Sequence, residues 1–300
     1  MATAAEPRPA ELPLRGGREG ARVKLHPLLT GQRIAPRPWF LREPGRFAWR
    51  RAAGIRVKKE DWLDVPVPAF LVEHPGAGPI LIDTGFHPSV AARPQANLGR
   101  LSQFTFRNIE MTAEQAASAQ LRARGIEPSQ VKVVVMTHLH IDHASAIAEF
   151  PDSTFLVSSA EWAAASEQGQ FHGYVKRQFD HGFDWRVLDF EARDAESFSG
   201  FARSYDLFGD GSVRTVYTPG HTIGHMSVVL RTSRGEVLVA GDAIYLRRTL
   251  ADTHLPYRTA DDHLFRRSLR EIRQYATETP EALIVPGHDW DAWHELEAVY

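Results

Sequence analysis

The sequence contains no cysteine in its 300 residues. Disulfide bonds, thiolate metal ligands and a cysteine nucleophile are therefore excluded, and any bound metal must be held by nitrogen and oxygen atoms. The sequence also lacks an apolar run of membrane-spanning length, and its N-terminus lacks the apolar core of a signal peptide. These absences predict a cytoplasmic protein without a membrane partner.

An excess of charge of one sign is also missing. The 35 Lys and Arg residues nearly balance the 37 Asp and Glu residues, which leaves a formal net charge of -2. Such a balance offers no overall attraction to nucleic acid or to an anionic membrane. Hydrophobic residues make up 43% of the chain, enough for the packed core of one large domain or two smaller ones.

What the sequence does contain is a dense group of metal-binding residue types at 137 to 143, Thr-His-Leu-His-Ile-Asp-His. Random placement of 14 histidines in 300 residues would rarely give this spacing. The β-branched run at 131 to 136 predicts a buried strand before the motif, and residues 144 to 148 begin like a short helix after it. The motif is therefore expected in a strand-to-helix loop, where functional sites are common.

The spacing within this motif suggests two metal ions. In an extended stretch, His138 and His140 point the same way and can share one ion. The turn that follows directs Asp142 and His143 toward a second ion. The alternative is a set of surface histidines with Asp142 as a helix cap, which the spacing disfavours.

Other predicted strands also end at a possible functional residue. The strands at 215 to 217, 237 to 240 and 283 to 285 each lead to a turn containing glycine, and these turns carry His221, Asp242 and His288, respectively. Another strand, at 79 to 82, ends at Asp83. This carboxylate either orients a ligand histidine or forms an ordinary turn, and the first role is favoured. Each turn alone is unremarkable, but together they complete a set of ligands.

The rest of the chain predicts one large domain. Residues 1 to 20 are expected to be a disordered leader, and residues 21 to 300 a single domain. A basic, aromatic arm at 33 to 59 is expected to pack on the body or on a second subunit, as in a homodimer, rather than to bind nucleic acid. The aromatic-rich insertion at 171 to 208 predicts a satellite core, with lining of an apolar substrate pocket as the alternative.

Capping signals predict several helices between the strands. Thr112 with Gln115 begins one that ends at Gly125, and Ser158 with Glu161 begins another. Residues 259 to 278 show helical spacing of apolar residues. Strands alternating with helices, in two similar halves, suggest sheets packed face to face and covered by helices.

These residues resemble the metallo-β-lactamase superfamily. The matching elements, in the family order, are Asp83-Thr84-Gly85, the motif at 137 to 143, His221 in Thr-Pro-Gly-His-Thr-x-Gly-His, Asp242 in Gly-Asp-Ala and His288 in Pro-Gly-His. The resemblance implies an α+β fold, the αββα sandwich of two packed mixed β-sheets flanked by helices. It also implies two divalent metal ions, expected to be zinc. His138, His140 and His221 would bind one ion, Asp142, His143 and His288 the other, and Asp242 would bridge them.

Within the superfamily, the chain is most similar to the N-acyl homoserine lactonases that act in quorum quenching. Tyr245 lies three residues after Asp242, as it does in them, and residues 138 to 144 are similar throughout. The resemblance implies a hydrolase that opens a lactone or related ester by attack of a metal-bridging hydroxide. Tyr245 would stabilise the oxyanion, and Asp142 would pass a proton to the leaving alkoxide. Phe104 and Phe106, in a segment that could cover the pocket, are candidates to hold an acyl chain.

Several other functions use the same kind of site. A glyoxalase-II-like thioesterase, or another esterase of this fold, would present the same ligands, although such thioesterases carry a helical extension and here 12 residues follow His288. A persulfide dioxygenase would use one iron and leave His143 and His288 idle. A nuclease would need a basic track, and a non-catalytic binding module would be expected to lack ligands, none of which is missing here.

Overall fold

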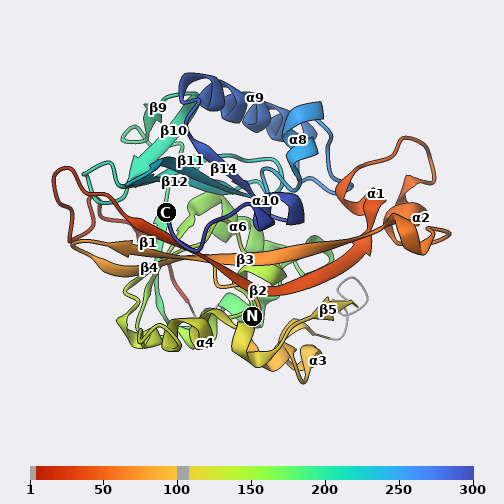
Figure 1. Cartoon of the computed structure of the whole chain (residues 1–300), viewed down its shortest axis with the longest axis horizontal. Helices are drawn as coiled ribbons and strands as arrows, with labels where there is room; N and C mark the ends of the chain where they lie inside the picture. The colour runs from red at the N-terminus through yellow and green to blue at the C-terminus, as the bar shows by residue number, and fades with distance from the viewer. Residues whose placement is uncertain (1–4, 100–107) are drawn as a thin grey trace.

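The computed structural model describes residues 5 to 99 and 108 to 300 of the chain. Two β-sheets face each other in this part of the chain, and helices cover the outer face of each (Figure 1). Both sheets combine parallel with antiparallel strand pairs. The predicted αββα sandwich of two mixed sheets is confirmed. No helix in the described ranges is both long and apolar enough to cross a membrane.

The elements have the following bounds. In spatial order, the first sheet consists of β1 (Arg8–Pro9), β8 (Asp184–Leu188), β7 (Thr154–Ser158), β6 (Val133–Val135), β4 (Gly78–Ile82), β3 (Trp62–His74), β2 (Lys24–Pro36) and β5 (Ile109–Glu110). The second consists of β14 (Leu283–Pro286), β13 (Gly235–Gly241), β12 (Met226–Thr232), β11 (Val213–Tyr217), β10 (Phe201–Asp206) and β9 (Glu196–Phe198). The α-helices are α1 (Arg37–Phe40), α2 (Ala48–Ala52), α3 (Pro94–Leu98), α4 (Ala117–Arg122), α5 (Ile141–Ala144), α6 (Ser159–Glu167), α7 (Lys176–Phe179), α8 (Arg247–Asp252), α9 (Asp262–Glu278) and α10 (Trp290–His294).

The main core lies between the two sheets. Alternate residues of β3, among them Phe70 and Val72, meet Met226 and Val228 of β12 in one buried cluster. Because successive side chains of a strand point to opposite faces, the other residues of β3 are left for the outer layers. The inner cluster makes the sandwich rigid, and the strand ends are therefore held in fixed positions.

The helices bury the outer faces of the sheets. Helix α9 packs Phe265, Leu269 and Ile272 against the second sheet, as the helical spacing predicted. On the other side, Leu121 of α4 and Trp162 of α6 lie in a cluster with residues of the first sheet.

The Ser158 side chain caps α6 as predicted, since it accepts from the backbone N–H of Glu161. Thr112 and Gln115 form a capping box, but it begins a 3₁₀ turn at Ala113–Gln115, and the extended backbone of Ala116 separates this turn from α4. The single helix expected from Thr112 to Gly125 is therefore wrong.

The prediction of a disordered leader is wrong for residues 5 to 20. Strand β1 pairs in parallel with β8, and the backbone N–H of Leu14 donates to Leu207 O at 2.7 Å. Leu12 and Leu14 also pack against the inner core. The composition of this segment is that of a disordered chain, but the free edge of β8 supplies the backbone partners that an isolated segment lacks.

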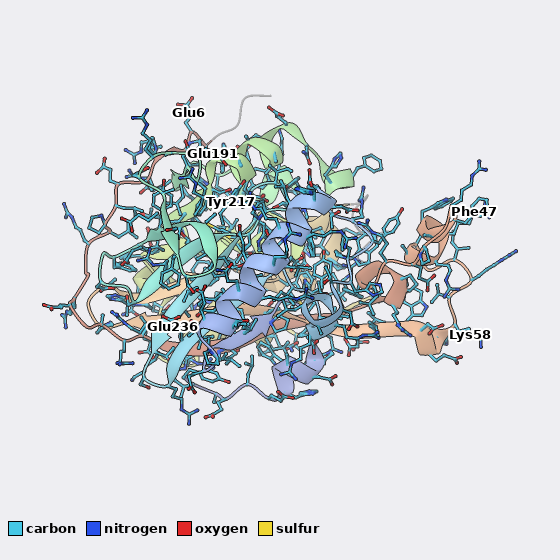
Figure 2. The ribbon with its side chains drawn as sticks, turned by 90° about the horizontal axis from the view of Figure 1, so that it is seen from above. Glu6, Phe47, Lys58, Glu191, Tyr217 and Glu236 are labelled. Atoms are coloured by element: carbon cyan, nitrogen blue, oxygen red, sulfur yellow. The ribbon has the colours of Figure 1, made fainter. Side chains whose placement is uncertain are left out.

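The N-terminal arm at 33 to 59 includes the end of strand β2 and most of the segment that connects β2 to β3. Strands β2 and β3 pair over most of their lengths, and the residues between them form α1, α2 and a 3₁₀ turn. The arm projects to one end of the molecule (Figure 1), and Figure 2 shows Phe47 and Lys58 at its tip. The base of the arm packs on the body, since Phe40 and Leu41 lie in a buried cluster with Tyr245. A homodimer through the arm stays a prediction.

Candidate metal centre and active site

The seven candidate ligands come together at one edge of the sandwich. Strands β11, β13 and β14 run in the same direction, so the loops after them, which carry His221, Asp242 and His288, meet at one edge. The loop after β6 and helix α5 carry the other four, His138, His140, Asp142 and His143. All seven are buried except His140, which is half-buried. Tertiary packing thus assembles the whole set proposed from the sequence.

Three histidine nitrogens form the first group of the site. Nε2 of His221 lies 3.2 Å from Nε2 of His138 and 2.8 Å from Nδ1 of His140. Burial lowers the pKa of His138 and of His221 well below the ordinary value, and it lowers the pKa of His140 to about 4. At neutral pH these rings are therefore uncharged, and three nitrogens at such distances are suited to a shared cation.

A second group contains Asp142, His143 and His288, whose ligand atoms lie within 4.8 Å of one another. Asp242 lies between the two groups. Its Oδ2 is 3.2 Å from Nε2 of His221, and its Oδ1 is 3.1 Å from Nε2 of His288 and 3.3 Å from Nε2 of His143. The carboxylate is thus placed to contact ions held by either group.

The charges of this second group indicate a site for cations. Burial acts to lower the pKa of His143, but Asp83 and Asp242 hold it well above its ordinary value, and Asp242 likewise raises that of His288. Burial acts to raise the pKa of Asp242, but His288, His221 and His143 hold it well below its ordinary value. Within the described residues, Nε2 of His143 and Oδ1 of Asp242 face each other at 3.3 Å without the alignment of a good hydrogen bond. The nitrogen and oxygen donors here fit divalent metal ions.

Asp83 orients His143, which is the role that the sequence favoured. Its Oδ2 accepts from Nδ1 of His143 at 2.7 Å and from Oγ1 of Thr137 at 2.7 Å, and its Oδ1 accepts from the Thr137 backbone N–H. A histidine that donates from one nitrogen presents the lone pair of the other in a fixed direction. The bond therefore directs Nε2 of His143 toward Asp242.

We expect Asp83→Asn to lower metal affinity roughly 10- to 100-fold, because the amide cannot hold His143 in this way. Asp83 has a φ of 56°, a conformation that asparagine tolerates, so the backbone should keep its course. Competition with a chromophoric chelator measures the affinity. The exposed Asp152→Asn is the matched control, and equal affinity in the two variants would contradict the role.

His225 is a supporting residue that the sequence reasoning did not single out. Its Nε2 accepts from the backbone N–H of Asp242 at 3.0 Å, and its Nδ1 lies 2.9 Å from Oγ1 of Thr218. Burial lowers its pKa to about 3, so the ring is neutral and can accept at one nitrogen and donate at the other. In the sequence, His225 is the second histidine of Thr-Pro-Gly-His-Thr-x-Gly-His, and this position could have identified it. Its bond to the Asp242 N–H holds the loop that carries Asp242.

Glu161 was also missed, since the sequence suggested only a helix cap. Its Oε1 accepts from the backbone N–H of Leu139 at 2.9 Å, between two candidate ligands. The carboxylate is fully buried, and burial raises its pKa. Through this hydrogen bond, helix α6 holds the loop that carries His138 and His140. No periodicity or spacing could show this contact, because it joins residues 22 positions apart.

Glu161→Ala is expected to lower the free energy of unfolding by about 1–3 kcal/mol, because it leaves the buried Leu139 N–H without an acceptor. Denaturant unfolding monitored by circular dichroism measures the change. Glu161→Gln keeps an acceptor oxygen and should recover much of the loss. Glu167→Ala, exposed on the same helix, is the control. Equal stability of the two alanine variants would show that the contact is unimportant.

The start of the aromatic insertion supports His140. Gly173 has a φ of 94°, and a Cβ there would lie 2.7 Å from the His140 ring. Its carbonyl accepts from the Ile141 N–H at 3.1 Å. Beyond this point the insertion is mostly core, since Phe179 and Trp185 lie in one buried cluster and Phe190 in another. The prediction of a separate satellite core is therefore wrong: these aromatic residues join the two main clusters, because the insertion contributes strand β8 to the first sheet. Residues 171 to 174 of the insertion line the pocket.

A cavity of about 380 Å³ opens directly on the site. Asp142, Asp242 and His288 lie in its wall with Tyr245, and Phe171 and Ile223 form part of its apolar lining. This volume lies in the range of small-molecule sites. The expected acyl-binding residues Phe104 and Phe106 lie outside the described residues.

Tyr245 lies beside the candidate ligands. Its Oη is 3.1 Å from Nδ1 of His221, and its ring makes an edge contact with Phe40 at a centroid distance of 5.9 Å. Burial, followed by the charges of Asp242 and Asp142, raises its pKa well above the ordinary value. The phenol is therefore protonated at neutral pH and is available as a hydrogen-bond partner in the cavity.

Comparisons with known proteins agree with this geometry. A model of the metallo-beta-lactamase superfamily matches residues 62 to 288. The chain belongs to this superfamily. It is 35% identical over 234 residues to the N-acyl homoserine lactonase AttM of Rhizobium radiobacter, a match that covers 77% of this chain and 84% of that protein. The expectation of a metal-dependent hydrolase of this superfamily is thereby confirmed.

Two solved structures show the same fold. One is an N-acyl homoserine lactone hydrolase with N-hexanoyl-L-homoserine bound at its catalytic metal centre. Its TM-score is 0.73 at 24% identity, over 92% of this chain and 97% of that one. The other is AidC, a dizinc quorum-quenching lactonase, with a TM-score of 0.62 at 14% identity, over 93% and 90% of the two chains. At these identities the likeness concerns the superfamily fold.

Proposed function

We propose that this protein is a dinuclear metal-dependent lactonase that hydrolyses N-acyl homoserine lactones. The observation that carries the proposal is the arrangement of the seven candidate ligands in two groups with Asp242 between them, and five of the seven line a cavity of about 380 Å³. The relatives and neighbours named as lactonases support the choice of substrate.

The donor set assigns each metal position. His138, His140 and His221 would hold one ion, Asp142, His143 and His288 the other, and Asp242 would contact both. Zinc is the expected metal, as in the dizinc neighbour. When bound, the two ions would polarise the lactone carbonyl and lower the pKa of a water molecule, so that hydroxide is available near neutral pH.

Tyr245 is proposed to donate a hydrogen bond to the lactone carbonyl oxygen. Because Nε2 of His221 faces the metal position, the proton of that ring must lie on Nδ1. In this state the Tyr245 oxygen accepts from His221, and its own O–H is the donor. In the structure this O–H bonds the Asp242 carboxylate, and it would turn to the lactone carbonyl when Asp242 contacts the ions. A donor so placed stabilises the negative charge that develops on the carbonyl oxygen during attack.

Asp142 is proposed to deliver a proton to the leaving alkoxide. Its Oδ2 is 3.7 Å from Nε2 of His288, and the residue lies in the cavity wall. Helix α5 is buried around it, so the carboxylate has little room to turn away. Asp142 would take this proton from the hydroxide that adds to the carbonyl carbon and pass it to the alkoxide, so that the opened product carries one new carboxylate and one new hydroxyl group.

The alternatives differ from this proposal in measurable ways. A thioesterase or another esterase of this fold would use the same ligands on a different carbonyl group. A persulfide dioxygenase with one iron would leave His143 and His288 idle, yet both face Asp242 here. A cytoplasmic location and the lack of a nucleic-acid partner stay predictions.

Elemental analysis and a substrate panel test the proposal together. We expect about two zinc ions per chain, and turnover of N-hexanoyl homoserine lactone well above that of a glutathione thioester or a phosphodiester. Chelation should abolish this turnover, and added zinc should restore it. Preference for the thioester would favour the glyoxalase-II-like alternative, and a single iron per chain would favour the dioxygenase.

A further inference from the structure

A second cavity of about 410 Å³ adjoins the cavity of the metal centre. The two share the side chains of Arg33, Trp39 and Arg258 in their walls. Helix α1 lies between them: Phe40 packs near His288 at a ring-centroid distance of 6.5 Å, and the preceding residue, Trp39, lines the second cavity. The two cavities are therefore neighbours with a common wall at Arg33, Trp39 and Arg258.

The second cavity is formed largely by the N-terminal arm, and its described lining is aromatic. Trp39, Trp49, Trp62 and Tyr257 contribute flat faces. The Trp39 and Tyr257 rings lie 6.1 Å apart, and their backbones are joined by a hydrogen bond of 2.9 Å from Tyr257 N to Trp39 O. The Trp62 ring packs over Gly54, where a Cβ would lie only 2.8 Å from it. These contacts hold the Trp39, Tyr257 and Trp62 rings in place.

Cationic groups complete the lining where the two cavities meet. The Arg33 guanidinium lies 5.2 Å from the centroid of the Trp39 ring, and Arg33 is almost fully buried. Among the described lining residues, Ile34 is the one large aliphatic side chain, and the other apolar ones are alanines and a proline. Flat aromatic walls with guanidinium groups favour a planar, electron-rich group by stacking, whereas a flexible alkyl chain gains mainly from burial.

We propose that the second cavity binds the distal end of the acyl group and prefers a planar aromatic ring there to an alkyl chain. The substrate class is then the N-aroyl and N-arylacryloyl homoserine lactones. This inference rests on the proposed lactonase function, since the lactone ring must occupy the first cavity. It assigns a selective role to the arm through Trp49 and Trp62, which line the second cavity and not the first.

The test compares three lactones on the zinc-loaded, full-length protein: N-cinnamoyl homoserine lactone, N-hexanoyl homoserine lactone and γ-butyrolactone, which has no acyl group. The wild-type protein should prefer the cinnamoyl substrate in kcat/KM. Trp62→Leu keeps an apolar wall but removes the stacking face, so it should lower that preference roughly five- to tenfold. It should leave γ-butyrolactone turnover within about twofold, because the residue is remote from the first cavity.

Two further variants keep the test independent of folding. Trp49 is 49% exposed, so Trp49→Leu should fold normally and should shift the preference in the same direction. Phe47→Leu replaces an exposed aromatic residue of the same arm that lines neither cavity, and it should change nothing. Calorimetric binding of the two opened products, N-cinnamoyl- and N-hexanoyl-L-homoserine, should show the same shift without turnover.

The outcomes separate this inference from the function on which it rests. If all three lactones are hydrolysed but the wild type shows no cinnamoyl preference, the aromatic subsite is overturned and the lactonase function stands. Equal losses for both acyl substrates in Trp62→Leu and Trp49→Leu would overturn it as well. If none of the lactones is hydrolysed, the proposed function itself is overturned.

Discussion

His288→Ala is expected to remove at least one of two metal ions per chain and to lower kcat/KM for N-hexanoyl homoserine lactone by roughly a thousandfold or more. The residue is held from behind, because its Nδ1 donates to Pro66 O at 2.8 Å. Its Nε2 faces Asp242 at 3.1 Å. Alanine removes a ligand that neither neighbouring side chains nor a shift of the backbone can replace. Elemental analysis and steady-state kinetics measure the two effects.

A matched control separates loss of the ligand from loss of the fold. His263→Ala replaces an exposed histidine at the start of α9 and should retain both ions and full activity. Circular dichroism should show both variants folded, since the sandwich core lies away from His288. Two bound ions and wild-type turnover in His288→Ala would refute the assignment of the second metal position.

The second large effect is expected for Tyr245→Phe, which should retain both metal ions but lower kcat roughly 10- to 1,000-fold. Phenylalanine keeps the ring contact with Phe40 and removes only the hydroxyl group that lies 3.1 Å from Nδ1 of His221. The loss should fall on kcat more than on KM, because an oxyanion donor acts mainly in the transition state.

Tyr205→Phe is the control for this prediction. Tyr205 is another buried tyrosine, but its hydroxyl donates to Asp189 O, and it does not line the cavity. Its removal should leave kcat unchanged. Full activity in Tyr245→Phe would exclude the proposed donor role and would leave Tyr245 as a packing residue that bonds His221.

The sequence predicted the site better than the surroundings of the site. The motif at 137 to 143 places its candidate ligands close together, because a short stretch sets the directions of neighbouring side chains. The helix cap at Ser158 is local in the same sense and is present in the structure. The prediction that residues 1 to 20 are disordered was wrong from residue 5 onward. Strand β1 of this segment pairs with β8, which lies far along the chain and therefore leaves no local signal in the sequence.

The residues that hold the site in place also show the difference between local motifs, which the sequence reveals, and contacts between distant segments, which it does not. His225 lies within a recognisable motif, but its bond to the Asp242 N–H depends on two strands lying side by side. Glu161 looked like a helix cap, yet its carboxylate reaches Leu139. The sequence of α6 has no distinct apolar face, so it indicates neither which side of the helix is buried nor which group Glu161 meets there.

By itself, the sequence determined the superfamily through motifs of short, fixed spacing, and the resemblance to that superfamily implied the fold class and the candidate ligands. Only the tertiary structure decided how the two groups of ligands face Asp242, which groups orient them, and that a second, aromatic cavity adjoins the first. The reason is physical. Local spacing sets where a side chain points from its own strand or loop, whereas the shape of a cavity depends on segments as distant as the N-terminal arm and Tyr257, which only the packed sheets and helices bring together.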